Sequence, residues 1–136
     1  CAAFAQGNLG KAMRYAKSED FIERKDHIIS LLRHVEQMDL SEMLAVIKDL
    51  GTRKDEVRDY IDLMVLWYRD VLLFKATKDI NQLLFQDEAS YISREASHRS
   101  YEKIEEILQA FEKAKVRLRA NVNFDITMEL MLLTLK

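Results

Sequence analysis

The sequence predicts an all-α fold, a single helical domain of about six to seven helices. Shortages of proline and glycine indicate this fold. The 136 residues include no proline, where average usage gives about seven, and only 3 glycines, where it gives about ten. A protein built from strands and tight turns needs these residues at its turns. The third observation is that apolar residues recur at the helical period along most of the chain.

The charge balance excludes several classes of protein. Lys and Arg number 21 and Asp and Glu 23, so the net charge is −2, without the basic excess of a nucleic-acid-binding domain. The longest apolar run, 63–68, is too short to span a membrane. Cys1 is the single cysteine and forms no internal disulfide. Because the chain starts with cysteine, we expect a fragment or a processed chain. A single cysteine is typical of a reducing compartment, so we expect the chain to be cytoplasmic.

Capping residues divide the chain into successive helices. Asn, Ser or Asp precedes most of them, because these side chains accept hydrogen bonds from the free N–H groups at a helix start. Gly51 stands where a left-handed glycine ends the third helix. Residues 78–87 indicate an irregular link with some buried anchors. We expect helices over 8–17, 18–38, 40–50, 54–76, 88–97, 100–120 and from 123 onward.

Two helices carry more apolar surface than one buried face needs. In the helix over 54–76, Leu66 and Leu73 interrupt the polar side and Trp67 adds to the apolar one. Such a helix is either central and buried or faces a partner. In the final helix we expect Ile126, Leu130 and Leu133 to point inward. Glu129, a lone acid there, should face solvent or find a hydrogen-bond partner.

No arrangement of side chains predicts catalysis. Glu23, His27 and His34 share one helical face, which could bind a metal, but boundary or surface histidines are the more frequent explanation of such spacing. Nucleophile and phosphate-loop motifs are absent from the sequence. We therefore expect no catalytic, cofactor-binding or metal-binding residues.

Two further features have alternative interpretations. The basic run 113–119 could contact phosphate, but it also fits the positively charged end of a helix that begins with acids. The apolar run around Trp67 could line a small-molecule pocket, although core or interface packing is more usual for such residues. A stand-alone regulatory or ligand-binding domain with a pocket near Trp67 is therefore an alternative to an interaction domain.

Two segments resemble a known family. Residues 5–12, Ala-Gln-Gly-Asn-Leu-Gly-Lys-Ala, are similar to the end of the lid domain in AAA+ clamp-loader subunits, with Gly7 and Gly10 at motif positions. Residues 118–135, which contain Asn121, Asn123 and Glu129, resemble the C-terminal segment of the delta-prime family of the bacterial DNA polymerase III clamp loader. The family's ATP-hydrolysing relatives place an arginine where this chain has Gly10, so the resemblance favours delta-prime over gamma or tau.

The resemblance implies a domain organisation and a role. Residues 1–17 would end the AAA+ lid, and residues 18–136 would form the C-terminal collar domain. This domain would pack beside the delta and gamma or tau subunits in a pentameric collar that supports loading of the sliding clamp onto primed DNA. No direct DNA contact, membrane contact or small-molecule substrate is expected. From surplus apolar surface we expect the subunit interface to involve Leu66, Trp67, Leu73, Met128, Met131 and Leu132.

Overall fold

The computed structural model describes residues 19–136, and within this range it is helical without a strand. The all-α prediction is confirmed. The expected helix over 8–17, the lid segment and the motif glycines Gly7 and Gly10 lie outside the described residues. The α-helices are α2 (Glu19–His34), α3 (Leu40–Gly51), α4 (Lys54–Thr77), α5 (Ala89–His98), α6 (Tyr101–Arg119) and α7 (Phe124–Leu135).

The chain divides into two compact units, with the boundary between His34 and Val35. The described part of the first unit is α2, whose buried apolar side chains are Ile28, Ile29, Leu31 and Leu32. The second unit begins with a short 3₁₀ turn, Val35–Gln37, and holds α3 to α7. The candidate site lies entirely in this second unit.

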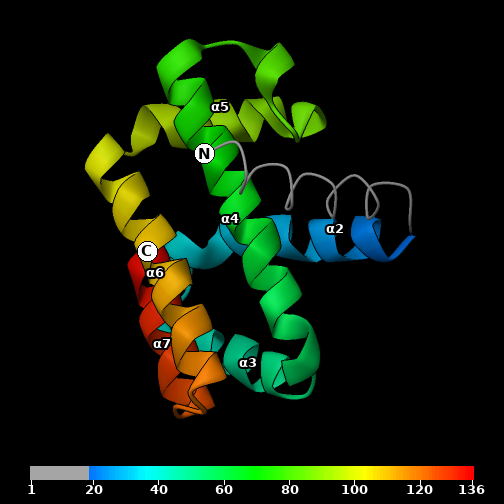
Figure 1. The fold of residues 1–136 in the computed structure, drawn as a ribbon, viewed down its shortest axis with the longest axis vertical. Helices are drawn as coiled ribbons and strands as arrows, with labels where there is room; N and C mark the ends of the chain where they lie inside the picture. Colours follow the sequence, from blue (N-terminus) through cyan, green and yellow to red (C-terminus); the bar gives the residue numbers. More distant parts are fainter. Residues whose placement is uncertain (1–18) are drawn as a thin grey trace. The chain divides into compact units, whose positions relative to one another are not determined.

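The second unit is assembled around α4, its longest helix (Figure 1). Helix α4 packs against α5 and α6, and α7 packs against both α6 and α3. Tyr68 of α4 and Phe111 of α6 meet in the interior with ring centroids 5.8 Å apart. The fully buried side chains include Tyr68, Phe111, Met43, Ile61, Ile92, Ile104, Ile107, Met128, Met131, Leu132 and Leu135.

The caps of three helices agree with the sequence. The Asp39 carboxylate accepts from Glu42 N–H at the start of α3, and the Ser100 hydroxyl accepts from Lys103 N–H at the start of α6. The Asn123 side chain does the same for Ile126 N–H at the start of α7. These bonds satisfy N–H groups that have no partner within their own helix.

The prediction for Gly51 was wrong. Gly51 is the last residue of α3 and has no positive φ, and Thr52 follows in the right-handed helical region. An added Cβ at Gly51 would lie 3.8 Å from the ring of Phe124, which is ordinary contact. The left-handed residues of the described range are Lys78, which ends α4, and Asn121, after α6. Glycine is therefore not required here, because Thr52 continues a right-handed turn rather than reversing it.

The link after α4 is irregular with buried anchors, as expected. It contains two 3₁₀ turns, Ile80–Gln82 and Gln86–Glu88, and it buries Leu83 and Phe85. The Asp70 carboxylate of α4 accepts hydrogen bonds from Leu84 N–H at 3.1 Å and from Phe85 N–H at 2.8 Å. Burial raises the pKa of Asp70, while these two hydrogen bonds act to lower it.

The prediction for the inward face of α7 was reversed. Ile126, Leu130 and Leu133 are exposed, whereas the opposite face packs inward with Thr127, Met128, Met131, Leu132 and Leu135. Apolar residues surround this helix almost completely, so their spacing does not distinguish the inner face from the outer one. Glu129 lies beside the buried face and is partly exposed.

No helix among residues 19–136 combines the length and the apolar character needed to cross a membrane.

Candidate interaction surface

The outward face of α7 is the most apolar exposed helix face of the second unit. Ile126, Leu130 and Leu133 are 54%, 45% and 48% exposed. They lie four and three residues apart, so they form one stripe along the helix. Three large aliphatic side chains in one stripe are characteristic of a surface that another protein covers. We call this set the α7 stripe.

Helix α3 lies antiparallel to α7. At one end Lys136 Nζ donates to the carbonyl oxygen of Met38, 2.6 Å away. At the other end Gly51 lies against Phe124. Helix α3 also carries exposed leucines, Leu40 and Leu44, one turn apart. Two neighbouring helices thus leave large apolar side chains uncovered.

A small groove separates the α7 stripe from α6. Its volume is about 200 Å³, and its walls include Leu130 and Met131 of α7 and Ala110 of α6. Lys113, Arg117 and Glu106 of α6 also line it. The groove therefore extends the apolar surface of the stripe and gives it a charged border, with two basic side chains and one acidic side chain.

The structure separates the six residues that the sequence suggested for an interface. Trp67, Met128, Met131 and Leu132 are at most 3% exposed and belong to the core. Leu66 and Leu73 of α4 are half-buried, and they lie seven residues apart on one side of that helix. Of these six, only Leu66 and Leu73 retain surface that a partner could cover.

Asn121 and Asn123 form a tight reversal between α6 and α7. Asn121 is left-handed, with φ 57°, and Val122 N–H donates to the carbonyl oxygen of Arg117 at 3.0 Å. Asn123 then caps α7 through Ile126 N–H. Asparagine tolerates the left-handed region better than most residues. The motif asparagines therefore have structural roles, one at each end of the turn.

A second cleft, of about 420 Å³, lies beside this turn. Its walls come from three segments: the first turns of α4, the last turn of α6 and the 121–124 segment. The charged side chains lining it are Lys54, Arg58 and Arg119, all positive. We call this site the basic cleft. The Lys54 ammonium lies 5.0 Å from the centre of the Phe124 ring, within the range of a cation–π contact.

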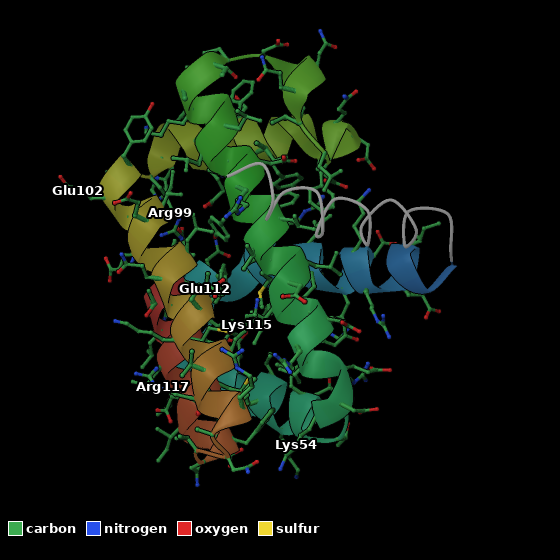
Figure 2. The ribbon with its side chains drawn as sticks, viewed as in Figure 1. Lys54, Arg99, Glu102, Glu112, Lys115 and Arg117 are labelled. Atoms are coloured by element: carbon green, nitrogen blue, oxygen red, sulfur yellow. The ribbon has the colours of Figure 1, made fainter. Side chains whose placement is uncertain are left out.

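The basic run 113–119 is divided among different surroundings. Lys115 faces α4, where its Nζ lies 2.9 Å from a carboxylate oxygen of Asp62 (Figure 2). Lys113 and Arg117 line the groove beside α7, and Arg119 lines the basic cleft. One helix thus distributes its positive charge among an ion pair and two surface depressions.

Arg99 is a buried arginine that forms three hydrogen bonds within the second unit. No sequence pattern indicated this role. Arg99 lies at the corner between α5 and α6 (Figure 2) and is 6% exposed. Its Nη2 donates to Glu36 at 2.6 Å and to the carbonyl oxygen of Leu135 at 2.7 Å, and its Nε donates to Glu95 at 2.8 Å. These bonds join the turn after α2, the end of α5 and the last turn of α7. A charged residue between two predicted helices gives no periodic signal, so only the structure identifies this role.

The alternatives of a metal site and a ligand pocket gain no support. Within residues 19–136, no three His, Cys, Asp or Glu side chains are grouped closely enough to hold a metal ion. The Glu23, His27 and His34 stripe is therefore not such a group. The Trp67 indole is buried against Phe85, with ring centroids 5.9 Å apart. A ring enclosed in this way is not an open wall of a pocket.

Comparison with known families assigns the chain. Residues 18–136 match the family model described as DNA polymerase III, delta subunit, C terminal. The chain belongs to this family. No curated protein and no solved structure matches it significantly.

Family membership gives the general role of the chain. It is the C-terminal domain of a clamp-loader subunit of DNA polymerase III, and it acts in replication within a complex of several proteins. The family is a non-catalytic part of that complex. For such a domain, an exposed apolar stripe on a well-packed helical unit is the expected form of a protein-binding surface.

Proposed function

We propose that this chain is the collar domain of a delta-prime subunit, preceded in residues 1–17 by the end of the AAA+ lid. The resemblance of residues 118–135 to the delta-prime C-terminal segment supports the subunit assignment. The family model that matches is described for the delta subunit, so the choice of delta-prime rests on that resemblance. Gly10 favours delta-prime over gamma or tau, because a residue without a side chain cannot replace the nucleotide-sensing arginine of the ATP-hydrolysing subunits. The domain would act in the cytoplasm, without catalysing a reaction.

The proposed role is to hold neighbouring subunits together. The observation that carries it is the α7 stripe, three large aliphatic side chains about half exposed on a helix whose other face is fully packed. A member of a closed ring needs two lateral faces, because it contacts a neighbour on each side. The α7 stripe would supply one of them. The half-buried Leu66 and Leu73 of α4 are our candidates for the other.

Mixing the purified chain with partner subunits tests this proposal. We expect a shared peak, heavier than any component, when the chain is run with the delta and tau subunits of the same organism on a size-exclusion column with light-scattering detection. A full-length subunit containing this domain should give the pentamer mass. If the full-length subunit elutes separately from both partners, the collar assignment is wrong.

A further inference from the structure

We propose that the basic cleft binds the phosphate backbone of single-stranded DNA. This proposal goes beyond the collar role, which depends on apolar surface elsewhere. It also reverses the expectation from the net charge of −2 that the domain makes no direct DNA contact. Local charge decides such binding, because a phosphate responds to the cations within a Debye length, about 10 Å at 0.1 M salt.

The charge of the cleft is of one sign. Lys54, Arg58 and Arg119 line it, and no Asp or Glu does. None of the three forms an ion pair with any described residue. Lys115 of the same surface, by contrast, is neutralised by Asp62 at 2.9 Å. Three cations without a counter-charge around one depression are positioned for an anion that the chain itself does not supply.

The three cations come from segments distant in sequence. Lys54 and Arg58 lie one turn apart on α4, while Arg119 is the last residue of α6. The 121–124 reversal, fixed by left-handed Asn121 and the Asn123 cap, forms the remaining wall. A structured turn and two helix ends therefore hold the charges around one volume of about 420 Å³, within the size range of ligand sites.

The lining favours nucleic acid over a protein partner. Stable protein interfaces concentrate apolar and aromatic anchors at their centre. The apolar residues that line the cleft, Leu118, Val122 and Phe124, lie beside three cations, whereas the stripe of three exposed aliphatic side chains lies on α7. Arginine guanidinium groups match the geometry of phosphate oxygens. The chain belongs to a family of DNA polymerase III, so DNA is the polyanion beside which it works.

The concave form favours a single strand. Phosphates of a flexible strand can follow the wall of a depression, as in the grooves of single-strand-binding proteins. A duplex is stiff over about 150 base pairs, so it can touch only the rim of a site of this size. The basic cleft should therefore prefer single-stranded to double-stranded DNA of the same length.

Fluorescence anisotropy with a labelled 20-nucleotide oligo(dT) tests the proposal. We expect Lys54→Gln, Arg58→Gln and Arg119→Gln each to weaken binding about eightfold at 50 mM salt, and log K to fall with log salt at a slope of about −2. Each single variant should flatten that slope by about 0.7. The control is a triple variant, Lys48→Gln, Arg94→Gln and Lys113→Gln, which removes the same charge outside the cleft and should bind nearly as the parent chain does.

Three results would overturn binding of DNA at the cleft, and a fourth would overturn the preference for a single strand. The first is that the parent chain does not bind oligo(dT) at 50 mM salt. The second is that the control triple variant loses as much affinity as the cleft variants do, which would indicate non-specific attraction. The third is competition by oligoglutamate stronger than that by unlabelled oligo(dT), which would assign the cleft to an acidic protein segment. A duplex of equal length that binds as tightly would overturn the preference for a single strand. Circular dichroism melting of every variant confirms that each remains folded, and amide NMR shifts at Asn121 and Asn123 locate the binding.

Discussion

The Arg99 guanidinium and the Glu36 carboxylate meet at 2.6 Å between Nη2 and Oε1, although 63 positions separate them in sequence. The same nitrogen binds the carbonyl oxygen of Leu135. Arg99 thus connects the beginning and the end of the 35–136 unit. Burial alone would lower the pKa of Arg99, but Glu95, Tyr68 and Glu36 outweigh this effect, so the pKa is raised and the guanidinium stays charged.

We predict that Arg99→Met destabilises the domain by about 3–5 kcal/mol, because it leaves Glu95 and the Leu135 carbonyl without their partner in a buried site. Arg99→Lys should recover only part of this loss, since lysine lacks the planar fork. Arg94→Met on exposed α5 surface is the control and should change stability by less than about 0.5 kcal/mol. Urea unfolding of the three variants measures the differences. Equal stability of the Arg99→Met and control variants would contradict the role of Arg99.

Asp70 predicts a specific dependence of stability on pH. Folding raises its pKa above the ordinary value of 3.8, so the folded state binds more protons than the unfolded state just above that pH. The contribution of Asp70 to stability therefore falls as pH rises from 3.8 through the folded pKa. Asp70→Asn removes this titration, so its stability relative to the parent chain should increase over the same window. Unfolding measured from pH 3 to 7 detects the trend, and an opposite trend would show that the hydrogen bonds from Leu84 and Phe85 outweigh burial.

Removing the Asp70 carboxylate tests its connection to the link after α4. Asp70→Ala leaves two backbone N–H groups, those of Leu84 and Phe85, without their acceptor. We expect a loss of about 1–3 kcal/mol and faster amide hydrogen exchange in residues 80–88. Asp55→Ala, on exposed α4 surface, is the control. Unchanged exchange in the link would mean that its buried anchors Leu83 and Phe85 hold it without Asp70.

We predict different effects on stability for two substitutions of Asn121, in the turn between α6 and α7. Asn121 has φ 57°, so Asn121→Gly should be tolerated within about 0.5 kcal/mol. Asn121→Val should cost about 1–2 kcal/mol, because a branched side chain is strained in the left-handed region. Thermal melting of the two variants gives the comparison. Equal melting temperatures would show that the turn adopts another conformation.

The sequence predicts the buried face of a helix well when apolar and polar residues lie on opposite sides of it. Helix α6 was predicted closely, because Ser100 caps it and its apolar stripe, with Ile104 and Phe111, is set against charged residues. Helix α7 was identified correctly but its face was reversed. Met128 and Leu130 are similarly apolar, and packing against α3 and α6 decides which is buried. Apolar periodicity predicts the buried face only where one face of a helix is apolar and the other is polar. In a helix that is apolar on most sides, packing against neighbouring helices decides which face is buried.

The candidate sites show the same limit. The sequence places an asparagine, Asn123, at the start of the final helix, and its hydrogen bond from Ile126 N–H agrees with a cap there. The sequence does not predict the basic cleft, because Lys54, Arg58 and Arg119 come together only when the end of α6 lies beside the start of α4. Arg99 was missed for the same reason, since its partners lie on three distant segments.

The central claim is that the outer face of α7 binds a neighbouring subunit while the inner face holds the fold. The most direct measurement compares two double variants of the full-length subunit, Leu130→Asp with Leu133→Asp and Met128→Asp with Leu132→Asp, by light scattering and thermal melting. We predict that the first pair keeps its melting temperature and loses assembly with partner subunits. The second pair should lose the fold itself, because it buries unpaired charge. Normal assembly of the folded first pair would contradict the claim.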